Sequence, residues 1–373
     1  MVATALSLRA DPLDTWQSPN PLPQGNNLNA VSYGDALFVA VGDYGTILTS
    51  NDGLRWTRRA SGSSNHLNGV RYGKGQWVTV GWSGTILTSS DAITWTKQNY
   101  EIPNPLYGIN YGNGQWVAVG VITGAVLTSP DAISWTRRSS GSGTYNLSQI
   151  SYANGLWVAV GGFNMPLVAS GGTILTSSDG INWTGRSYPV YFTGVSYGNG
   201  LWVAVGIRVR SGAAPGRMLT STDGNSWTEQ PGTQKALSGI HYGNGLWVAV
   251  GDGGTILTSP DGISWTGRTS GTGNTLRGIS SGNELWVAVG DSGTILTSGQ
   301  DGGPPALSIT LSGKNAVVAW PVDATGFVLE SAMDLVAPQN WIAVNDKPVI
   351  ANSQNTISEA ISGSRRFYRL RKE

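Results

Sequence analysis

The sequence predicts an all-β protein, a seven-bladed β-propeller closed by an N-terminal strand and followed by a small β-sandwich-like domain. Three observations in the 373 residues support this fold class. A strand-like phrase, WVAVG or a near copy, recurs seven times at a period of about 40 residues. A second phrase, of the form ILTSxDGxxWT, follows each copy. Glycine (53) and tryptophan (16) are abundant, which is typical of tight turns between short strands anchored by aromatic side chains.

Each repeat unit reads as four short strands. In the sixth unit these are ALSGIHYG, LWVAVG, GTILTS and SWTGRTS, separated by the turn signals GNG, DGG and PDG. WVAV is apolar at its odd and at its even positions, so side chains on both faces of each sheet must be buried. Stacking of like units buries both faces. Four strands per unit in seven copies predict a propeller. The WVAVG copies begin at Phe38, Trp77, Trp116, Trp157, Trp202, Trp247 and Trp286.

The two ends of the repeat region predict how the ring closes. The seventh unit, ILTSGQDGGPPALS, never reaches a tryptophan, whereas Trp16 in LDTWQS precedes the first complete unit. We expect residues 12–19 to supply the outer strand of the seventh blade and to pair with the chain that ends near Ser298, which leaves no free sheet edge. The predicted propeller therefore spans residues 12–302, after a lead of residues 1–11.

The composition changes after Gly303. The stretch GGPPALSITLSGKNAVVAWPVDATGFVLES opens with a Gly-Pro hinge and then alternates like strands, without the repeat phrases. Residues 303–373 therefore predict a small β accessory domain.

The repeated aspartates are predicted to cap turns. An aspartate side chain accepts hydrogen bonds from backbone N–H groups two residues on, and seven equivalent copies cannot all form one active site. These aspartates are Asp52, Asp91, Asp131, Asp179, Asp223, Asp261 and Asp301.

Two features of the repeat resemble known families. The turn SxDGxxW resembles the Asp-box, or BNR repeat, of sialidase-like propellers, although every copy is one residue shorter than the usual box. VGDGGTILTSPDG is similar to the repeat of photosystem II assembly-factor-like propellers. The resemblance implies a box between the third and fourth strands, on the face opposite the active site, with its tryptophan packed between blades.

The ending SRRFYRLRKE resembles the C-terminal module of secreted proteins from Verrucomicrobia-type bacteria. This resemblance implies a bacterial protein that is secreted or held at the cell surface. The start MVATALSLRADP lacks the features of a signal peptide, so we expect none within this chain.

Candidate ligand-binding residues lie where the repeats differ. Three aspartates follow VAVG in blades one, six and seven, which are neighbours once the ring closes, and we expect them to form an acidic arc opposite the arginines of two long loops. The alternative is that Asp-Gly is ordinary hairpin chemistry and the arginines are simply solvated. Tyrosines between blades add further candidates. So does one position on the first strand of each unit, where the residue is mostly polar and varies between copies. The alternative for that position is a water-filled channel that tolerates substitution. The candidates are Asp43, Tyr44, Trp82, Tyr107, Tyr145, Tyr191, Arg208, Arg210, Asp252, Arg277 and Asp291.

Charge and composition narrow the function classes. The net charge of +1 gives no long-range electrostatic field that would attract nucleic acid. No apolar run is long enough to span a membrane. There is no cysteine, which excludes disulfides and thiolate metal sites. The two histidines, His66 and His241, lie on different blades with no carboxylate phrase beside them, so we expect neither a catalytic triad nor a metal site. We assign no catalytic residue and no cofactor.

The sequence thus favours an exported, non-catalytic and monomeric propeller that binds a glycan or a protein through its loops. The alternative is a hydrolase or lyase acting on polysaccharides, with the acidic arc and the opposing arginines as its site.

Overall fold

The computed structural model describes residues 13, 15–19, 22–98, 103–121, 125–141, 146–163, 171–207, 215–298, 307–313, 315–321, 327–332, 341–344, 346–351, 354–360 and 366–372. The chain divides into two compact units. One is Thr15–Gly299, and the other combines Met1–Asp14 with Gln300–Glu373. Within the described residues, helical structure is confined to four three-residue 3-10 turns, none of which is long or apolar enough to cross a membrane.

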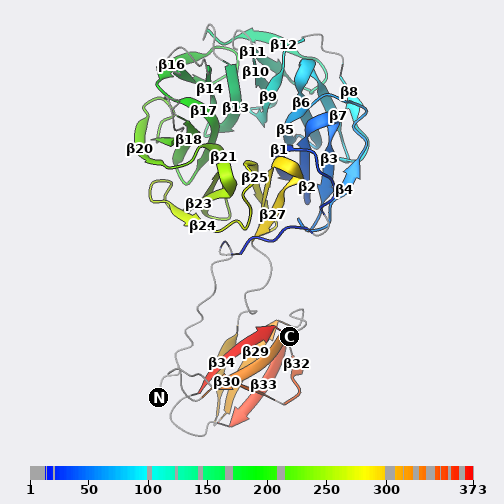
Figure 1. Cartoon of the computed structure of the whole chain (residues 1–373), viewed down its shortest axis with the longest axis vertical. Helices are drawn as coiled ribbons and strands as arrows, with labels where there is room; N and C mark the ends of the chain where they lie inside the picture. The colour runs from blue at the N-terminus through cyan, green and yellow to red at the C-terminus, as the bar shows by residue number, and fades with distance from the viewer. Residues whose placement is uncertain are drawn as a thin grey trace. The chain divides into compact units, whose positions relative to one another are not determined.

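The first unit is a ring of antiparallel sheets, the arrangement of a β-propeller (Figure 1). Among the described residues there are seven such sheets, six with four strands and the last with three. In every sheet the strands pair in chain order. The first strand of each sheet lies against the first strand of the next, and the first strand of the seventh sheet contacts that of the first sheet, so the ring is closed.

The strands recur in the same four positions around the ring. The inner strands are β1 (Leu28–Gly34), β5 (Leu67–Gly73), β9 (Leu106–Gly112), β13 (Asn146–Ala153), β17 (Tyr191–Gly198), β21 (Leu237–Gly243) and β25 (Leu276–Gly282). The second strands are β2 (Leu37–Gly42), β6 (Gln76–Gly81), β10 (Gln115–Gly120), β14 (Leu156–Phe163), β18 (Leu201–Ile207), β22 (Leu246–Gly251) and β26 (Leu285–Gly290). The third strands are β3 (Ile47–Ser50), β7 (Ile86–Ser89), β11 (Ala125–Ser129), β15 (Gly171–Ser177), β19 (Gly216–Ser221), β23 (Thr255–Ser259) and β27 (Ile295–Ser298). The outer strands are β4 (Thr57–Arg59), β8 (Thr96–Lys97), β12 (Thr136–Ser139), β16 (Thr184–Tyr188), β20 (Thr228–Thr233) and β24 (Thr266–Arg268).

The cores lie between neighbouring sheets. Between the first and second sheets, Val39 and Val41 of β2 pack with Trp77 of β6 and with Trp95, which follows β7. Trp77 is 1% exposed, and its equivalents in four other sheets are also fully buried. Both faces of each second strand are therefore covered, which explains why WVAV is apolar at every position.

The predicted closure of the ring by the N-terminal segment is confirmed at one residue pair. Gln17 and Thr297 exchange two backbone hydrogen bonds, of 2.9 and 2.8 Å, in antiparallel pairing. The same pairing joins Thr57 to Thr49 in the first sheet, so Trp16 holds the position that Trp56 holds there. The segment contributes an isolated bridge to the seventh sheet rather than a full strand.

The SxDGxxW turns link the third and fourth strands and are built as predicted for capped turns. In the sixth sheet Oδ1 of Asp261 accepts hydrogen bonds from the backbone N–H groups of Ile263 and Ser264, each at 2.8 Å, and from the hydroxyl of Ser259. The indole N–H of Trp265 donates to the carbonyl of Gly262. The capping role is confirmed for six aspartates, namely Asp52, Asp91, Asp131, Asp179, Asp223 and Asp261; Asp301 lies outside the described residues.

The second unit contains two small antiparallel sheets, as predicted for a β-sandwich-like domain. Their orders are β28-β29-β33-β32 and β31-β30-β34. Val318, Trp320 and Ile357 from the first sheet share one core with Leu329 and Leu370 from the second. The strands are β28 (Ser308–Ser312), β29 (Asn315–Pro321), β30 (Phe327–Ala332), β31 (Ile342–Ala343), β32 (Val349–Ala351), β33 (Gln354–Ala360) and β34 (Phe367–Lys372).

Candidate ligand-binding site

One face of the propeller carries all the connections from second to third strands and from each sheet to the next. Because Leu28 at the start of β1 pairs with Gly42 at the end of β2, both connections emerge at the same end of the sheet. The SxDGxxW turns emerge at the other end, since Ser50 pairs with Phe38 at the start of β2. We call the first of these the loop face, and the predicted candidates Asp43, Trp82, Asp252 and Asp291 lie on it.

Four connections on the loop face are identical 3-10 turns. They are η1 (Asp43–Gly45), η2 (Trp82–Gly84), η3 (Asp252–Gly254) and η4 (Asp291–Gly293). In each, the carbonyl of the first residue accepts the N–H of the residue after the turn, and the second residue is left-handed, with φ of 52° to 59°. Trp82 makes this turn without a carboxylate. Among the described hydrogen bonds, none joins an aspartate carboxylate to a backbone N–H of its own turn, so turn chemistry does not explain why aspartate is present at the other three positions.

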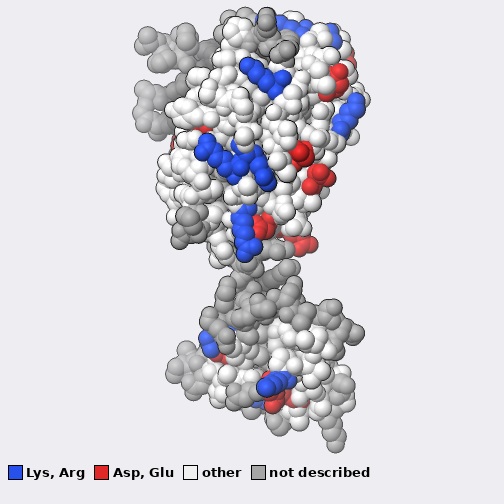
Figure 2. Space-filling model, turned by 90° about the vertical axis from the view of Figure 1, so that its right-hand side faces the viewer, with Lys and Arg blue, Asp and Glu red and all other residues white. Residues whose placement is uncertain are grey.

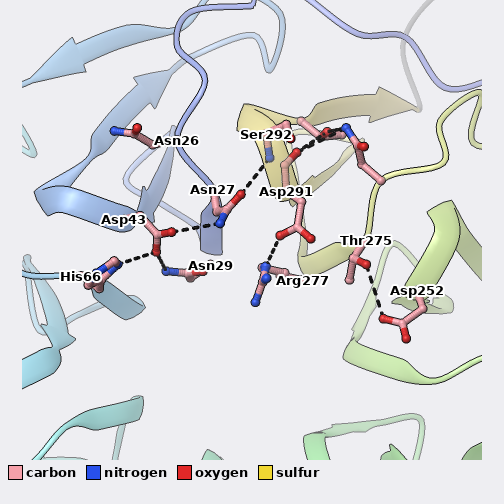
Figure 3. Close-up of polar contacts among 12 residues, drawn as sticks. Asn26, Asn27, Asn29, Asp43, His66, Asp252, Thr275, Arg277, Asp291 and Ser292 are labelled. Carbon is pink, nitrogen blue, oxygen red and sulfur yellow. Dashed lines mark hydrogen bonds and ion pairs between the residues drawn. The ribbon is translucent and has the colours of Figure 1, made fainter. Parts of the chain in front are cut away.

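Asp43 is the centre of a hydrogen-bond network (Figure 3). Its carboxylate accepts from the side-chain amides of Asn27 and Asn29, both at 3.0 Å, and lies 2.8 Å from Nδ1 of His66. The Asn27 side chain also accepts the backbone N–H of Ser292 in η4, so it joins the first sheet to the seventh. Burial opposes ionisation of Asp43, but hydrogen bonds from Asn29 and His66, the charge of His66 and the Asn27 hydrogen bond outweigh it, and the pKa of Asp43 is lowered.

His66 lies between two exposed aromatic side chains. Its ring centroid is 5.0 Å from that of Tyr44 and 4.8 Å from that of Trp82, with interplanar angles of 43° and 45°. Tyr44 is 64% exposed and Trp82 46% exposed, whereas most other large aromatic side chains of the propeller are buried or partly buried. These three rings come from η1, from the connection between the first two sheets, and from η2. They form a stepped aromatic surface that we call the aromatic stack.

The other two aspartates of the predicted acidic arc differ in their contacts. Asp291 forms an ion pair with Arg277. Asp252 is exposed, and among the described residues its carboxylate accepts only one long hydrogen bond, of 3.5 Å, from the hydroxyl of Thr275 (Figure 3). The three aspartates therefore occupy equivalent places on neighbouring sheets, but two of them are already paired with basic groups of the same chain.

The mouth of the central channel is lined by the uneven polar position of the inner strands. Each of these residues is the extra residue of a β-bulge, and bulges re-aim side chains next to functional sites. They line a cavity of about 500 Å³ inside the ring, which we call the channel. The mouth residues are Asn29, Asn68, Tyr107, Ser148, Thr193, Ser238 and Arg277.

Two predicted tyrosines, Tyr107 and Tyr191, line the channel. The Ser148 hydroxyl donates to the phenol oxygen of Tyr191 at 3.4 Å. Burial and then the nearby Tyr191 raise the pKa of Tyr107. Asn29 also links the mouth to the aromatic stack, because its amide donates both to Asp43 and to the carbonyl of Leu67. The mouth and the stack are therefore connected by contacts that run from Asn29 through Asp43 to His66.

Three predicted candidates, Tyr145, Arg208 and Arg210, lie outside the described residues. Conversely, sequence reasoning left His66 without a neighbouring carboxylate and was wrong, because Asp43 lies beside it in space. It also missed Asn27, which joins η1 to η4. The sequence did contain a signal for this pair. His66 comes directly before Leu67, the first apolar residue of an inner strand, and Asp43 opens a turn of the preceding sheet.

The described residues of this surface include one carboxylate–imidazole pair, Asp43 and His66. Among the described residues, no hydrogen bond or ion pair joins the His66 side chain to a serine, a threonine or a second carboxylate. Among the described residues no three His, Cys, Asp or Glu side chains are placed to hold a metal ion. On the side shown in Figure 2, Lys and Arg form several separate groups with acidic residues among them, not one continuous basic surface of the kind that follows a nucleic-acid backbone.

Comparisons with known proteins show the fold. No protein-family model matches the sequence, and no curated protein matches it. Among solved structures, the chain is similar to YCF48 from Cyanidioschyzon merolae, with 17% identity, a TM-score of 0.57, and coverage of 76% of this chain and 98% of that one. A structure of YCF48 bound to D1 peptide matches at 17% identity and a TM-score of 0.59, covering 77% and 96%. Virginiamycin B lyase from Staphylococcus aureus matches at 12% identity and a TM-score of 0.64, covering 77% and 99%.

Proposed function

We propose that this propeller is a protein-binding module that holds a segment of another protein on its loop face. The observation that carries the proposal is the aromatic stack of Tyr44, His66 and Trp82, in which Tyr44 and Trp82 are exposed, whereas the other described Phe, Tyr and Trp rings of the propeller are buried or partly buried. Exposed Tyr and Trp held by a rigid scaffold are the side chains that most often anchor a protein partner.

The shape of the stack favours a peptide over a sugar. Its rings are tilted by 43° and 45° from one another and make a stepped surface, which suits side chains of varied shape better than the flat face of a pyranose ring. Asn29 already donates its two amide N–H groups to Asp43 and to the carbonyl of Leu67, but its side-chain oxygen can accept from a peptide N–H of a bound segment. Asn68 donates one N–H to the carbonyl of Leu106, so its second N–H and its oxygen can bond peptide groups. One structural neighbour is a YCF48 bound to a peptide, which is consistent with this use of the fold.

Selection of random peptides on the immobilised full chain tests the proposal. The test variant is Tyr44→Ser with Trp82→Ser, which removes two rings of the stack. The matched control is Ile93→Ser with Ile133→Ser, which removes two side chains of similar exposure, 51% and 59%, from the SxDGxxW turns on the other face. We expect selected peptides to bind the parent and the control equally, and the test variant at least about tenfold more weakly, equivalent to about 1.4 kcal/mol.

Other outcomes overturn the proposal. Peptides that bind the parent and the test variant equally would move the site away from the stack. A glycan array that gives saturable binding to the parent, with no peptide selected, would establish glycan recognition instead. Release of products from a panel of polysaccharides, abolished by Asp43→Asn, would establish the hydrolase or lyase alternative.

A further inference from the structure

A second polar ring lines the channel below its mouth. It lies three residues further along each inner strand than the mouth residues, which places it about 10 Å deeper. All of its members line the same cavity. We call it the lower ring, and it consists of Ser32, Arg71, Asn110, Ser151, Ser196, His241 and Ser280.

Arg71 is a positive charge without a counter-charge in the channel. The described residues that line the cavity include no Asp or Glu. The other arginine of the cavity, Arg277 at the mouth, is neutralised by Asp291, whereas no hydrogen bond or ion pair joins the guanidinium of Arg71 to any described residue. Desolvation lowers the pKa of Arg71, as expected for a guanidinium drawn out of bulk water. Such a charge, walled by uncharged groups, attracts anions.

His241 adds a polar group but no charge to the lower ring at neutral pH. It stands three sheets from Arg71 around the ring, and its Nε2 lies 3.1 Å from the Ser281 hydroxyl. Burial, and then the charge of Arg71, lower the pKa of His241 to about 3. Arg71 is therefore the cation of this ring among the described residues.

Ser32 supplies an independent sign of a missing partner. It lies on β1, next to the β5 strand that carries Arg71, and it is 2% exposed. Its Oγ is buried and has no hydrogen-bond partner among the described residues. Unpaired buried hydroxyls are rare because each loses its hydration without compensation. Because Oγ has almost no accessible surface, the Ser32 side chain must rotate about its Cα–Cβ bond to bring the hydroxyl to an acceptor in the channel beside Arg71.

We propose that the lower ring binds a small oxyanion, with the guanidinium of Arg71 and the hydroxyl of Ser32 as its main donors. A guanidinium presents two parallel N–H groups that match two oxygens of a carboxylate or phosphate group. Asn110 and His241 line the same cavity and add no charge to it at neutral pH. This site is separate from the aromatic stack, so it stands whether or not the loop face binds a protein.

Isothermal titration calorimetry on the full chain tests the proposal. Phosphate, sulfate and acetate are titrated separately at constant ionic strength with chloride as the background anion, so that the three arms distinguish the kind of oxyanion. We expect saturable binding of at least one of them to the parent. Arg71→Gln should weaken it at least tenfold and Ser32→Ala by a smaller factor. The control Arg55→Gln removes the same charge from an exposed turn residue and should leave binding unchanged.

A second measurement keeps the channel unchanged, so it does not require that the channel variants fold. The chain has only two histidines, so a His66→Asn variant assigns the imidazole NMR signals of His241. Addition of the bound anion should shift the His241 signals with the affinity measured by calorimetry and leave the His66 signals in place. The proposal is overturned by an absence of saturable binding up to ~10 mM of all three anions. It is also overturned by equal binding to Arg71→Gln and the parent, or by His241 signals that do not move.

Discussion

At the scale of single residues, each described SxDGxxW turn is stabilised by one carboxylate oxygen that accepts three hydrogen bonds. The same geometry recurs at six aspartates, with partners at the same offsets along the chain. The sequence could predict this role because the backbone N–H donors lie only two and three residues after the aspartate. Local hydrogen bonds of this kind do not depend on how sheets pack against one another.

Replacing one of these aspartates should cost stability and spare binding. Asp261→Ala leaves the N–H groups of Ile263 and Ser264 without their acceptor, so we expect the free energy of unfolding to fall by about 1 kcal/mol. Asp261→Asn keeps an acceptor oxygen and should lose less. Chemical denaturation of the three proteins measures the difference. An Asp261→Ala protein that unfolds at the same denaturant concentration as the parent would contradict the capping role.

The same hydrogen bonds predict how stability changes in acid. Backbone N–H groups of Ser264 and Ile263, then the Ser259 hydroxyl, lower the pKa of Asp261 to about 2, and equivalent contacts lower the pKa of Asp131 to about 2. The unfolded value is about 3.9, so the unfolded chain takes up protons first as the pH falls. This stabilisation is fully present above about pH 4 and is lost as the pH falls through about 2.

Thermal unfolding followed by circular dichroism should therefore show a melting temperature that falls steeply over this window. Asp261→Asn, which cannot titrate, should show a shallower fall than the parent. Equal slopes for the two proteins would mean that other groups control acid unfolding.

At the scale of elements, the 3-10 turns of the loop face depend on glycine at their third position. In η3 the φ of Gly254 is +71°, and a Cβ there would lie 2.0 Å from the backbone carbonyl oxygen of Thr272. The second position, Gly253, is also left-handed, but a Cβ there meets only the end of the Lys235 side chain. Tyr44, Ser83 and Ser292 hold the same place in the other three turns.

Two substitutions within η3 should therefore differ in cost. Gly254→Ala combines left-handed strain with a backbone clash and should lower the free energy of unfolding by more than about 2 kcal/mol. Gly253→Ala carries only the strain, about 1 kcal/mol. Urea denaturation of both proteins measures the two costs. Equal costs would show that the close approach of Thr272 does not constrain this turn.

The inner strands show why the candidate site was harder to predict than the sheets. Repeated apolar phrases predict strands and turns, and these agree with the structure. Strict alternation, however, would put residues three apart on opposite faces of a strand. The bulge at Asn29 breaks the alternation, so Asn29 and Ser32 both line the channel. The lower ring with Arg71 was missed for this reason, and the pairing of Asp43 with His66 was missed because it joins connections of different sheets.

At the scale of the whole molecule, the ring is held closed by a short contact between distant parts of the chain. Gln17 and Thr297 exchange two hydrogen bonds across 280 residues of sequence, and the Thr297 hydroxyl donates to the carbonyl of Gly53 in the first sheet. Without the N-terminal segment, β27 would be an unpaired edge at the seam of the ring. Such an edge offers free N–H and C=O groups to other chains.

Removal of this contact should therefore affect the whole propeller rather than one sheet. Deleting residues 1–19 exposes the β27 edge, so we expect a broad thermal transition, a lower melting temperature or insoluble protein. Gln17→Pro is a milder variant, because it removes one of the two exchanged hydrogen bonds and keeps the chain in place. It should lower the melting temperature by a smaller amount and keep the transition sharp. Ser18→Pro serves as the control, since no described backbone hydrogen bond from the Ser18 N–H is lost. A deletion variant that melts as sharply and at the same temperature as the parent would show that seven sheets close without the N-terminal segment.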